Sequence, residues 1–532
     1  MKKTVIAVVV LVLLLGVAPW GIGRIAEKRV NAGLDRLVEQ APYLTIVDRK
    51  WTPGWFRSEQ EVTFEVSGPW IRAMNPATVL ADIRKTEESV AAQSIEAADG
   101  SEDGDAAATA QQSADAGDAP ASDAPGDAAA AETKSIRLTV RNEILHGPVL
   151  WPASLGFARV NTKLVLSDKV KKELIEVFGT DEPLKISSRV GFFGGGSTRF
   201  YGDGHTIKFE EEDGELKYDD FELVIGYSKK FDDFEVDGSL PRVEMTNATT
   251  GGRVVMTDFS VVGESERVQG ELFDSDYRFA VDKLQIFDPE KKETSVENIH
   301  YVIKSDVDKG FMDISAKMGC GKIMSPFLKD LDFQLDEFHY DFSLRRLHAE
   351  TVDKLMADIK AVYSRPVETA ADVEKALFEP FKQHALELLR HDPEFVIDRI
   401  GIKTPEGEGY IKGVIRLKGV TDEDLQRASS SAPMALASKV DADVTIDVAN
   451  KLIEKIPNGN TGAGFAIDQG YAKREGEKLV SRIEYKNEEL KINGKPLPIP
   501  GFGSGGPPDG MSEGMSEDMS GDMESEAVPG EE

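Results

Sequence analysis

The sequence predicts an α+β protein that is predominantly antiparallel β: a large twisted or curved sheet with a few amphipathic helices and one N-terminal transmembrane helix. Three observations lead to this prediction. Apolar residues alternate with polar residues over many short runs, as in antiparallel strands with one covered face and one wet face. Apolar residues recur at helical spacing between residues 348 and 392. Twenty uncharged residues, Thr4 to Gly23, lie near the N-terminus.

The alternation is clearest between residues 135 and 347, where each apolar set faces one way while acids, lysines and serines face the other. The sets include Phe221, Leu223, Ile225 and Tyr227; Val255, Thr257, Phe259 and Val261; Tyr277, Phe279 and Val281; Ile299, Tyr301 and Ile303; and Met312, Ile314, Ala316 and Met318. The apolar phase changes from odd to even numbers at Asp336-Glu337, which predicts a β-bulge or a strand break at this point.

Residues 348–392 are predicted to form a helical pair. The apolar positions are Val352, Leu355, Met356 and Ile359 in the first helix, and Val373, Leu377, Phe381, Ala385 and Leu388 in the second. Pro366 separates the two helices. Such a pair is able to cover an apolar sheet face, and the sequence leaves open whether it does.

Residues 1–25 are predicted to be a transmembrane anchor whose helix continues to about residue 41. At 1.5 Å per residue, the apolar run matches a hydrocarbon layer of roughly 30 Å. The alternative is a cleaved signal peptide, but Pro19 and Trp20 directly follow the candidate cleavage site Val17-Ala18 and disfavour cleavage. Lys2 and Lys3 favour a cytoplasmic N-terminus. We therefore expect a single-pass protein of the bacterial inner membrane with the bulk of the chain in the periplasm.

The formal net charge of −31 disfavours nucleic acid and anionic membrane surfaces as partners, because both would repel an acidic chain. Residues 86–133 carry twelve acids and no Lys or Arg, and the chain after Lys495 carries nine acids and no base. Their composition predicts a disordered acidic insertion at 86–133 and a disordered acidic Met/Gly/Ser tail at 501–532. The alternatives are an acidic docking motif in the insertion and Cu(I) binding by the tail methionines Met511, Met515, Met519 and Met523.

The remaining chain divides into two β-rich stretches. Residues 42–85 and 134–347 are predicted to form a β-rich exported region that the acidic insertion interrupts. Residues 393–500 are predicted to form a second β-rich region after the helical pair.

No catalytic, cofactor-binding or metal-binding residues are predicted. The segment 194–198, Gly-Gly-Gly-Ser-Thr, lacks the lysine and spacing of a phosphate loop and predicts a hairpin tip. Asp441, Asp443 and Asp447 alternate with apolar residues, which favours the wet face of a strand over a calcium loop. His384 and His391 lack further ligands for a metal site. Cys320, the single cysteine, is expected in a turn; a reactive thiol or an intermolecular disulfide is the alternative.

Four features together resemble the YdgA-like family of bacterial envelope proteins of unassigned function. They are the opening Met1-Lys2-Lys3, the turn Lys50-Trp51-Thr52-Pro53-Gly54-Trp55-Phe56-Arg57-Ser58, the triplet His146-Gly147-Pro148, and the segment Glu489-Leu490-Lys491-Ile492-Asn493-Gly494-Lys495. The resemblance implies an N-terminally anchored envelope protein and supplies no catalytic residues. His146 is the residue to probe: it is a candidate titrating group, and the alternative is that its ring fixes a turn before Pro148.

The expected function is that of an inner-membrane-anchored periplasmic protein without enzymatic activity. It would serve as an envelope scaffold or hold a lipid-like ligand on an apolar sheet face. The alternative is an assembly factor that binds another envelope protein through a sheet edge or the helical pair. Expected partners are thus the inner membrane through the N-terminal helix and a lipid or another envelope protein; self-association is a further alternative.

Overall fold

The computed structural model describes residues 18–41, 43–67, 135–150, 154–209, 214–363, 370–431, 433–456 and 458–497. The first 17 residues of the predicted anchor, the acidic insertion and the acidic tail therefore lie outside the described residues. None of the helices within the described ranges is both long enough and apolar enough to cross a membrane.

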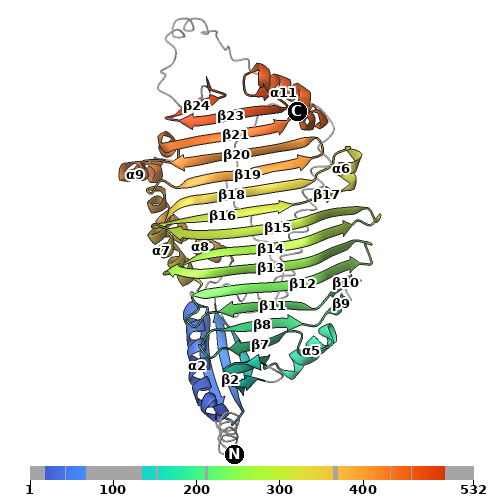
Figure 1. The fold of residues 1–532 in the computed structure, drawn as a ribbon, viewed down its shortest axis with the longest axis vertical. Coiled ribbons are helices and arrows are strands. Elements are labelled where there is room, and N and C mark those ends of the chain that lie inside the picture. The colour runs from blue at the N-terminus through green and yellow to red at the C-terminus, as the bar shows by residue number, and fades with distance from the viewer. Residues whose placement is uncertain are drawn as a thin grey trace, which may run out of the picture.

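The described chain is built around one 23-stranded antiparallel sheet (Figure 1). This confirms the predicted α+β class with predominantly antiparallel strands. The first strands are β1 (Leu44–Thr52), β2 (Arg57–Ser67), β3 (Ser135–His146), β6 (Ala158–Leu164), β7 (Lys185–Val190), β8 (Gly196–Gly202), β9 (His205–Phe209), β10 (Gly214–Tyr218), β11 (Phe221–Tyr227) and β12 (Asp233–Asn247). β4 (Val149–Leu150) and β5 (Ser154–Leu155) form a separate two-stranded sheet.

The longest strands occupy the middle of the sheet. The remaining strands are β13 (Arg253–Gln269), β14 (Leu272–Phe287), β15 (Glu293–Asp308), β16 (Phe311–Cys320), β17 (Ile323–Met324), β18 (Glu337–His348), β19 (Glu394–Thr404), β20 (Gly407–Leu417), β21 (Val440–Ala449), β22 (Lys473–Glu475), β23 (Lys478–Lys486), β24 (Glu489–Ile492) and β25 (Lys495–Leu497). β18 begins at Glu337, so the strand break predicted at Asp336-Glu337 is confirmed.

Strand pairing follows the order of the chain almost throughout. The main path is β1-β2-β3-β6-β7-β8-β11-β12-β13-β14-β15-β16-β18-β19-β20-β21-β23-β24-β25. The two predicted β-rich stretches therefore contribute to the same sheet. With a strand spacing of about 4.8 Å, this path has a length on the order of 85 Å.

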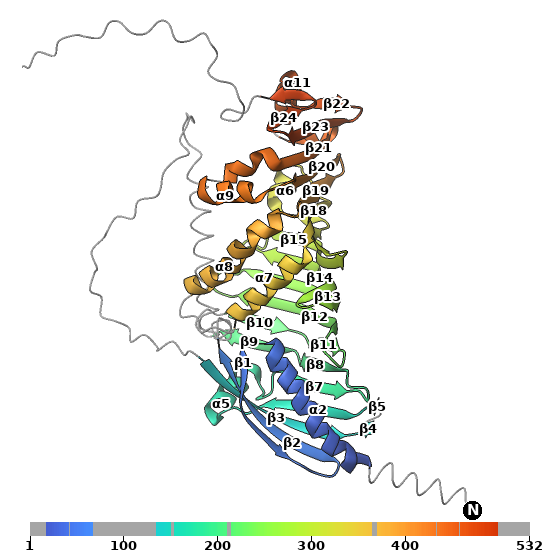
Figure 2. The same cartoon turned by 90° about the vertical axis from the view of Figure 1, so that its left-hand side faces the viewer.

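The helices lie at the margins of this sheet (Figures 1 and 2). They are α2 (Ala18–Gln40), α5 (Asp168–Phe178), α6 (Pro326–Asp330), α7 (Ala349–Val362), α8 (Ala370–Leu389), α9 (Asp422–Ser431), α10 (Asn450–Lys455) and α11 (Gly459–Asp468), with a 3-10 helix, η2, at Pro433–Lys439. Figure 2 shows α7, α8 and α9 on one side of the sheet.

Helix α5 was not predicted, although five of its eleven residues are apolar; none of its residues is buried. Its capping residues were the available signal. The Ser167 side chain accepts a hydrogen bond from the backbone N–H of Val170 at the N-terminus, and Gly179 adopts φ 68° at the C-terminus.

Two buried clusters attach the helices to the sheet. Ala26 of α2 packs with Ile144, Phe157, Ala158 and Val160 at the N-terminal end. Ala349 and Val352 of α7 pack with Leu272 and Met312 at the ends of β14 and β16, with Leu388 of α8 against them. Each cluster joins a helix to strand ends or to a terminal part of the sheet. Few residues from the middle of the strands belong to either cluster.

Substitution Leu272→Ala is expected to lower the free energy of unfolding by about 2–5 kcal/mol, because it leaves a cavity between β14 and α7. Leu272 is 1% exposed. Chemical denaturation followed by circular dichroism measures the change. The matched control is Leu344→Ala on the open part of the sheet, which should cost less than about 1 kcal/mol; equal losses in both variants would contradict the assignment of this core.

Candidate functional site

One face of the sheet carries rows of apolar side chains that run from strand to strand along its long axis. Antiparallel partners project to the same side of a sheet, so the register identifies each row. The first row contains Leu223, Gly238, Val261, Phe279, Tyr301, Met318, Tyr340, Ile400, Ile411 and Ile446. The second contains Ile225, Val236, Gly263, Tyr277, Ile303, Ala316, Phe342, Ile397, Gly413, Val444 and Ile483. We call these two rows the apolar face.

The apolar face is only partly covered by the described residues. Tyr301 is 38% exposed, Met318 43% and Tyr340 41%, although all three lie in the first row on central strands. Leu344 and Phe395, in the next row toward α7, are also exposed. Side chains of this kind are normally buried in a core, and a large exposed patch of them marks a binding surface.

Aromatic rings make part of the apolar face continuous. The ring centroids of Phe279 and Tyr301 lie 6.3 Å apart, those of Tyr340 and Phe342 5.6 Å, and those of Phe342 and Phe395 6.3 Å. These distances are within the range of favourable aromatic contacts.

A glycine gives room for one further ring. A Cβ atom at Gly263 would lie 2.2 Å from the ring of Tyr277, so the tyrosine lies across the glycine backbone. The Tyr277 hydroxyl lies 2.6 Å from the Ser265 hydroxyl, and Ser265 lies 2.9 Å from Ser275. A small group of hydroxyls therefore borders the apolar face where it approaches α7.

Beneath α2 the same row of the sheet becomes polar. The register continues the first row from Leu223 to Thr162, Asn142 and Gln60. Gln60 donates to Asn31 of α2 at 2.8 Å, Asn142 donates to Gln60 at 3.1 Å, and Thr162 donates to Asn142 at 2.7 Å. Because these buried polar groups pair with one another, the helix can cover this end without leaving them unsatisfied.

The opposite face of the sheet is charged. Lys304 pairs with Asp276 across neighbouring strands, and Arg416 pairs with Glu394 at 2.9 Å. Lys418 pairs with Asp441 at 2.6 Å, and the hydrogen bond from this lysine lowers the pKa of Asp441. This face is therefore suited to water, whereas the apolar face is suited to hydrocarbon.

The base of the helical pair is joined by two stacked histidines. The rings of His348, at the start of α7, and His391, just after α8, lie 3.8 Å apart at an interplanar angle of 11°. His348 Nδ1 lies 2.8 Å from the Thr351 hydroxyl, and His391 Nε2 lies 3.2 Å from Glu387. Burial lowers the pKa of His348 most, and the neighbouring His391 lowers it further.

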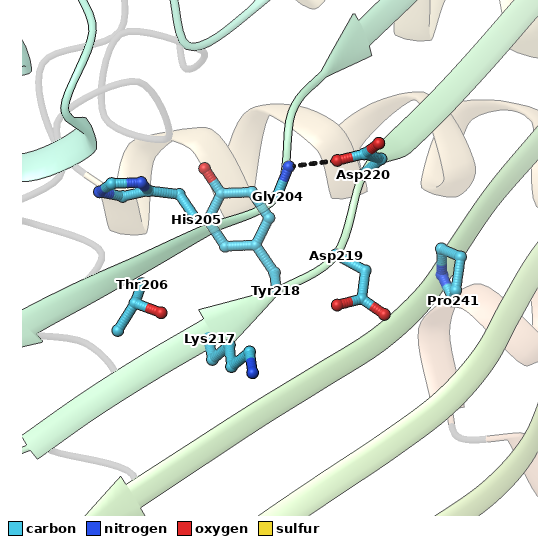
Figure 3. Close-up of a pocket in the computed structure, with 8 residues that line it drawn as sticks. All are labelled: Gly204, His205, Thr206, Lys217, Tyr218, Asp219, Asp220 and Pro241. Atoms are coloured by element: carbon cyan, nitrogen blue, oxygen red, sulfur yellow. Dashed lines mark hydrogen bonds between the residues drawn. The ribbon is translucent and has the colours of Figure 1, made fainter.

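The depressions found among the described residues are lined by mixed apolar, polar and charged side chains. Figure 3 shows one between β9, β10 and β12, lined by Gly204, His205, Thr206, Lys217, Tyr218, Asp219, Asp220 and Pro241. Asp220 accepts a hydrogen bond from the Gly204 backbone N–H at 2.6 Å, which joins two turns. Within the described ranges, no three His, Cys, Asp or Glu residues are grouped so that they could hold a metal ion.

The residues considered for chemistry are dispersed over the structure. Gly194 and Gly195 lie at the tip of the β7–β8 hairpin, whereas the other three residues of the predicted tip, 196–198, begin β8. Asp441 and Asp447 lie on β21 opposite its apolar face and pair with Lys418 and Lys478. His384 pairs with Asp358 across the helical pair at 2.7 Å.

Cys320 is the last residue of β16 rather than part of a turn, and burial raises the pKa of its thiol. The raised pKa reduces the thiolate fraction near neutral pH and therefore the reactivity of this cysteine.

His146 supports a turn. Its Nδ1 lies 3.1 Å from the Trp55 carbonyl oxygen, and its backbone N–H donates to the Phe56 carbonyl. The carbonyl oxygen can only accept, so Nδ1 carries the proton in the neutral ring. Nε2 is buried without a hydrogen-bond partner in the described structure. The ring thus holds the β1–β2 hairpin against β3; this role is structural, but the turn that it supports is not the predicted one before Pro148.

Glycines and Asn493 in three of the segments that carry the family resemblance also lie in turns, whereas Met1-Lys2-Lys3 lies outside the described residues. A Cβ at Gly54 would lie 2.0 Å from the Arg57 carbonyl oxygen, and one at Gly147 would lie 1.9 Å from that of Gly156. Asn493 and Gly494 both have positive φ between β24 and β25, as in the hairpin turn that Asn-Gly favours. These residues lie at opposite ends of the sheet and do not converge on one site.

A family model described as "Bacterial protein of unknown function (DUF945)" matches residues 1–500. No curated protein and no solved structure matches the chain.

Acidification is expected to loosen the helical pair. The pKa of His348 in the folded state lies below its unfolded value of about 6.5, so the unfolded state binds more protons in this window. The contribution of neutral His348 to the free energy of unfolding is fully present above the pKa of the unfolded state. It is lost as the pH falls through the pKa of the folded state. Hydrogen exchange of α7 and α8 at about pH 7.5 and about pH 5.5, corrected for intrinsic rates, measures this loss.

The variant His348→Gln should remove most of this pH dependence. The control His300→Gln changes a histidine whose nearest polar contact is the Asn298 carbonyl on β15, and it should leave the dependence intact. If His348→Gln retained the full pH dependence, the stacked pair would not be its source.

Proposed function

The chain belongs to the DUF945 family of bacterial proteins of unknown function, and we propose that it holds the hydrocarbon part of a lipid-like ligand on the apolar face. The observation behind this proposal is the exposure of Tyr301, Met318 and Tyr340 in one continuous row on central strands. The proposed role is to bind the ligand and not to catalyse a reaction, because the apolar face presents hydrocarbon and aromatic groups to the ligand.

The apolar face offers enough contact for a lipid chain. Each methylene group transferred from water to such a surface contributes about 0.8 kcal/mol. A chain that buries about ten methylenes would gain about 8 kcal/mol before the costs of immobilisation. The charged opposite face offers no comparable gain, so the ligand is expected on one side of the sheet only.

We further propose that the protein is a YdgA-like member of the cell envelope, anchored in the inner membrane by residues 1–25 with its bulk in the periplasm. The supporting observation is the uncharged run from Thr4 to Gly23 between Lys3 and Arg24. Such a tether would keep the apolar face close to a source of lipid.

A second candidate function is assembly with another envelope protein through the helical pair. Phe378 and Phe381 of α8 are 58% and 48% exposed. The edge strand β1 is less suitable, because it carries a bulge between Ile46 and Asp48 and the charged residues Arg49 and Lys50. Bulges and charges of this kind discourage strand addition.

The double substitution Met318→Glu, Tyr340→Glu should reduce the lipid that co-purifies with the protein about tenfold or more, because two carboxylates would lie in the middle of the apolar face. Both side chains are exposed, so the fold should tolerate the change. Mass spectrometry of protein extracted without detergent measures the bound lipid.

The matched control is Val262→Glu, a similarly exposed residue on the charged face between Asp237 and Arg278. This variant should retain the lipid. Absence of lipid from the parent protein would refute the lipid proposal and favour the assembly role.

The anchor makes a separate prediction. The full chain should remain in the inner-membrane fraction after washing with alkaline carbonate, and N-terminal sequencing should find no cleavage after Ala18. Release of a shortened chain into the periplasm would contradict the anchor and favour the cleaved signal peptide.

A further inference from the structure

We infer that two hairpin tips beside α2 rest on the lipid interface of a membrane and seat the N-terminal end of the sheet on it. This inference rests on the proposed membrane anchor and adds a second contact to it. The tips are the β1–β2 turn with Trp55 and Phe56 and the β7–β8 turn with Phe192 and Phe193.

The aromatic side chains of these tips are unusually exposed. Phe193 is 92% exposed, Phe56 57% and Trp55 51%. At such exposure the Phe193 ring contributes almost nothing to the core of the described structure. Aromatic residues that leave the fold and face outward are common at the boundary between lipid and water.

Hydrogen bonds fix the β7–β8 tip and attach it to α2. The Gly191 N–H donates to the Gly195 carbonyl at 2.7 Å, and the Gly194 N–H donates to the Gly191 carbonyl at 3.2 Å. Arg29 of α2 donates to the Phe192 carbonyl at 2.9 Å. The two phenylalanines are therefore held at the apex of a closed turn.

The β1–β2 tip is fixed in a similar way on β3. His146 contacts the Trp55 and Phe56 backbone, and the Gly54 N–H donates to the Ser58 hydroxyl at 3.3 Å. The turn leaves no space for a Cβ at Gly54. Both tips thus present their aromatic residues from an ordered backbone, which limits the entropy lost when they bind.

A shared core places both tips around the same turns of α2. Ala26 is fully buried with Ile144 and Ala158, and Trp51 and Val190 pack against this cluster. Trp51 lies four residues before Trp55, and Val190 lies two residues before Phe192. Figure 2 shows α2 crossing the N-terminal strands, with its first residues at the lower end of the molecule.

The position of the tips along α2 matches the end of the uncharged run. Ala26 is three residues beyond Gly23, about 4.5 Å along a helix axis. Ile25, 48% exposed, lies at the same level. If the run from Thr4 to Gly23 crosses the hydrocarbon, the aromatic tips come to lie at the boundary between headgroups and acyl chains, where Trp and Phe side chains insert.

Basic residues lie near the tips, although Asp232 and Asp233 also lie at the β11–β12 turn. Lys28 and Arg29 are exposed on α2, and Lys229 and Lys230 are exposed on the β11–β12 turn. Arg36 of α2 donates to the Lys229 carbonyl at 2.5 Å, which holds this turn against the helix. Basic residues within a Debye length of anionic lipids are attracted to them.

The test uses the full chain with Cys320→Ser, reconstituted in vesicles of phosphatidylethanolamine and phosphatidylglycerol. A spin label on Phe193→Cys reports the depth of the β7–β8 tip through the ratio of its collisions with oxygen and with a water-soluble nickel chelate. The matched control is a label on Phe327→Cys of α6, which is 68% exposed and distant from α2 in Figure 1.

The ratio at residue 193 should be several-fold higher than at residue 327. Equal ratios in a chain that floats with the vesicles would overturn the inference and leave the anchor standing. A chain that does not float would overturn both. The lipid proposal is tested separately, with the variant that replaces Met318 and Tyr340 by Glu. Neither result of the spin-label experiment bears on it.

Discussion

Backbone hydrogen bonding between antiparallel neighbours is the interaction on which the rest of the structure depends. It fixes the register from β1 to β25, and the register decides which side chains share a face. β19 illustrates the constraint. Phe395 and Ile397 precede the register shift, and Ile400 follows it, so odd and even positions reach the same face. Without this shift, Ile400 would lie among the charged residues opposite.

The helices among the described residues leave part of the apolar side of this long sheet uncovered. α2 and α7 pack on strand ends through Ala26 and Val352, and the central strands between them keep Met318 and Tyr340 exposed. Apolar surface in water is unfavourable, and its persistence over several strands is the observation from which we propose a site for a hydrocarbon ligand. The charged opposite side keeps the sheet compatible with water.

Much of the fold could be predicted because strand alternation is local. Phe221 to Tyr227 alternates as β11 does, and the phase change at Asp336-Glu337 marks the start of β18. The prediction missed α5, whose apolar face is not buried, and it placed Cys320 in a turn instead of at a strand end. The motif residues Gly54, His146 and Asn493 proved to serve turns, a role that becomes clear only when backbone contacts are known.

The sequence alone determined that the strands are two-sided, that the charge is concentrated outside them, and that no familiar catalytic spacing is present. These properties are visible because they depend on residues close together in the chain. The tertiary structure alone decided that both β-rich stretches join one sheet, that the helical pair covers only its margin, and that the strands leading to both aromatic tips pack on Ala26 of α2. Coverage and proximity depend on contacts between residues far apart in sequence, which a local pattern does not record.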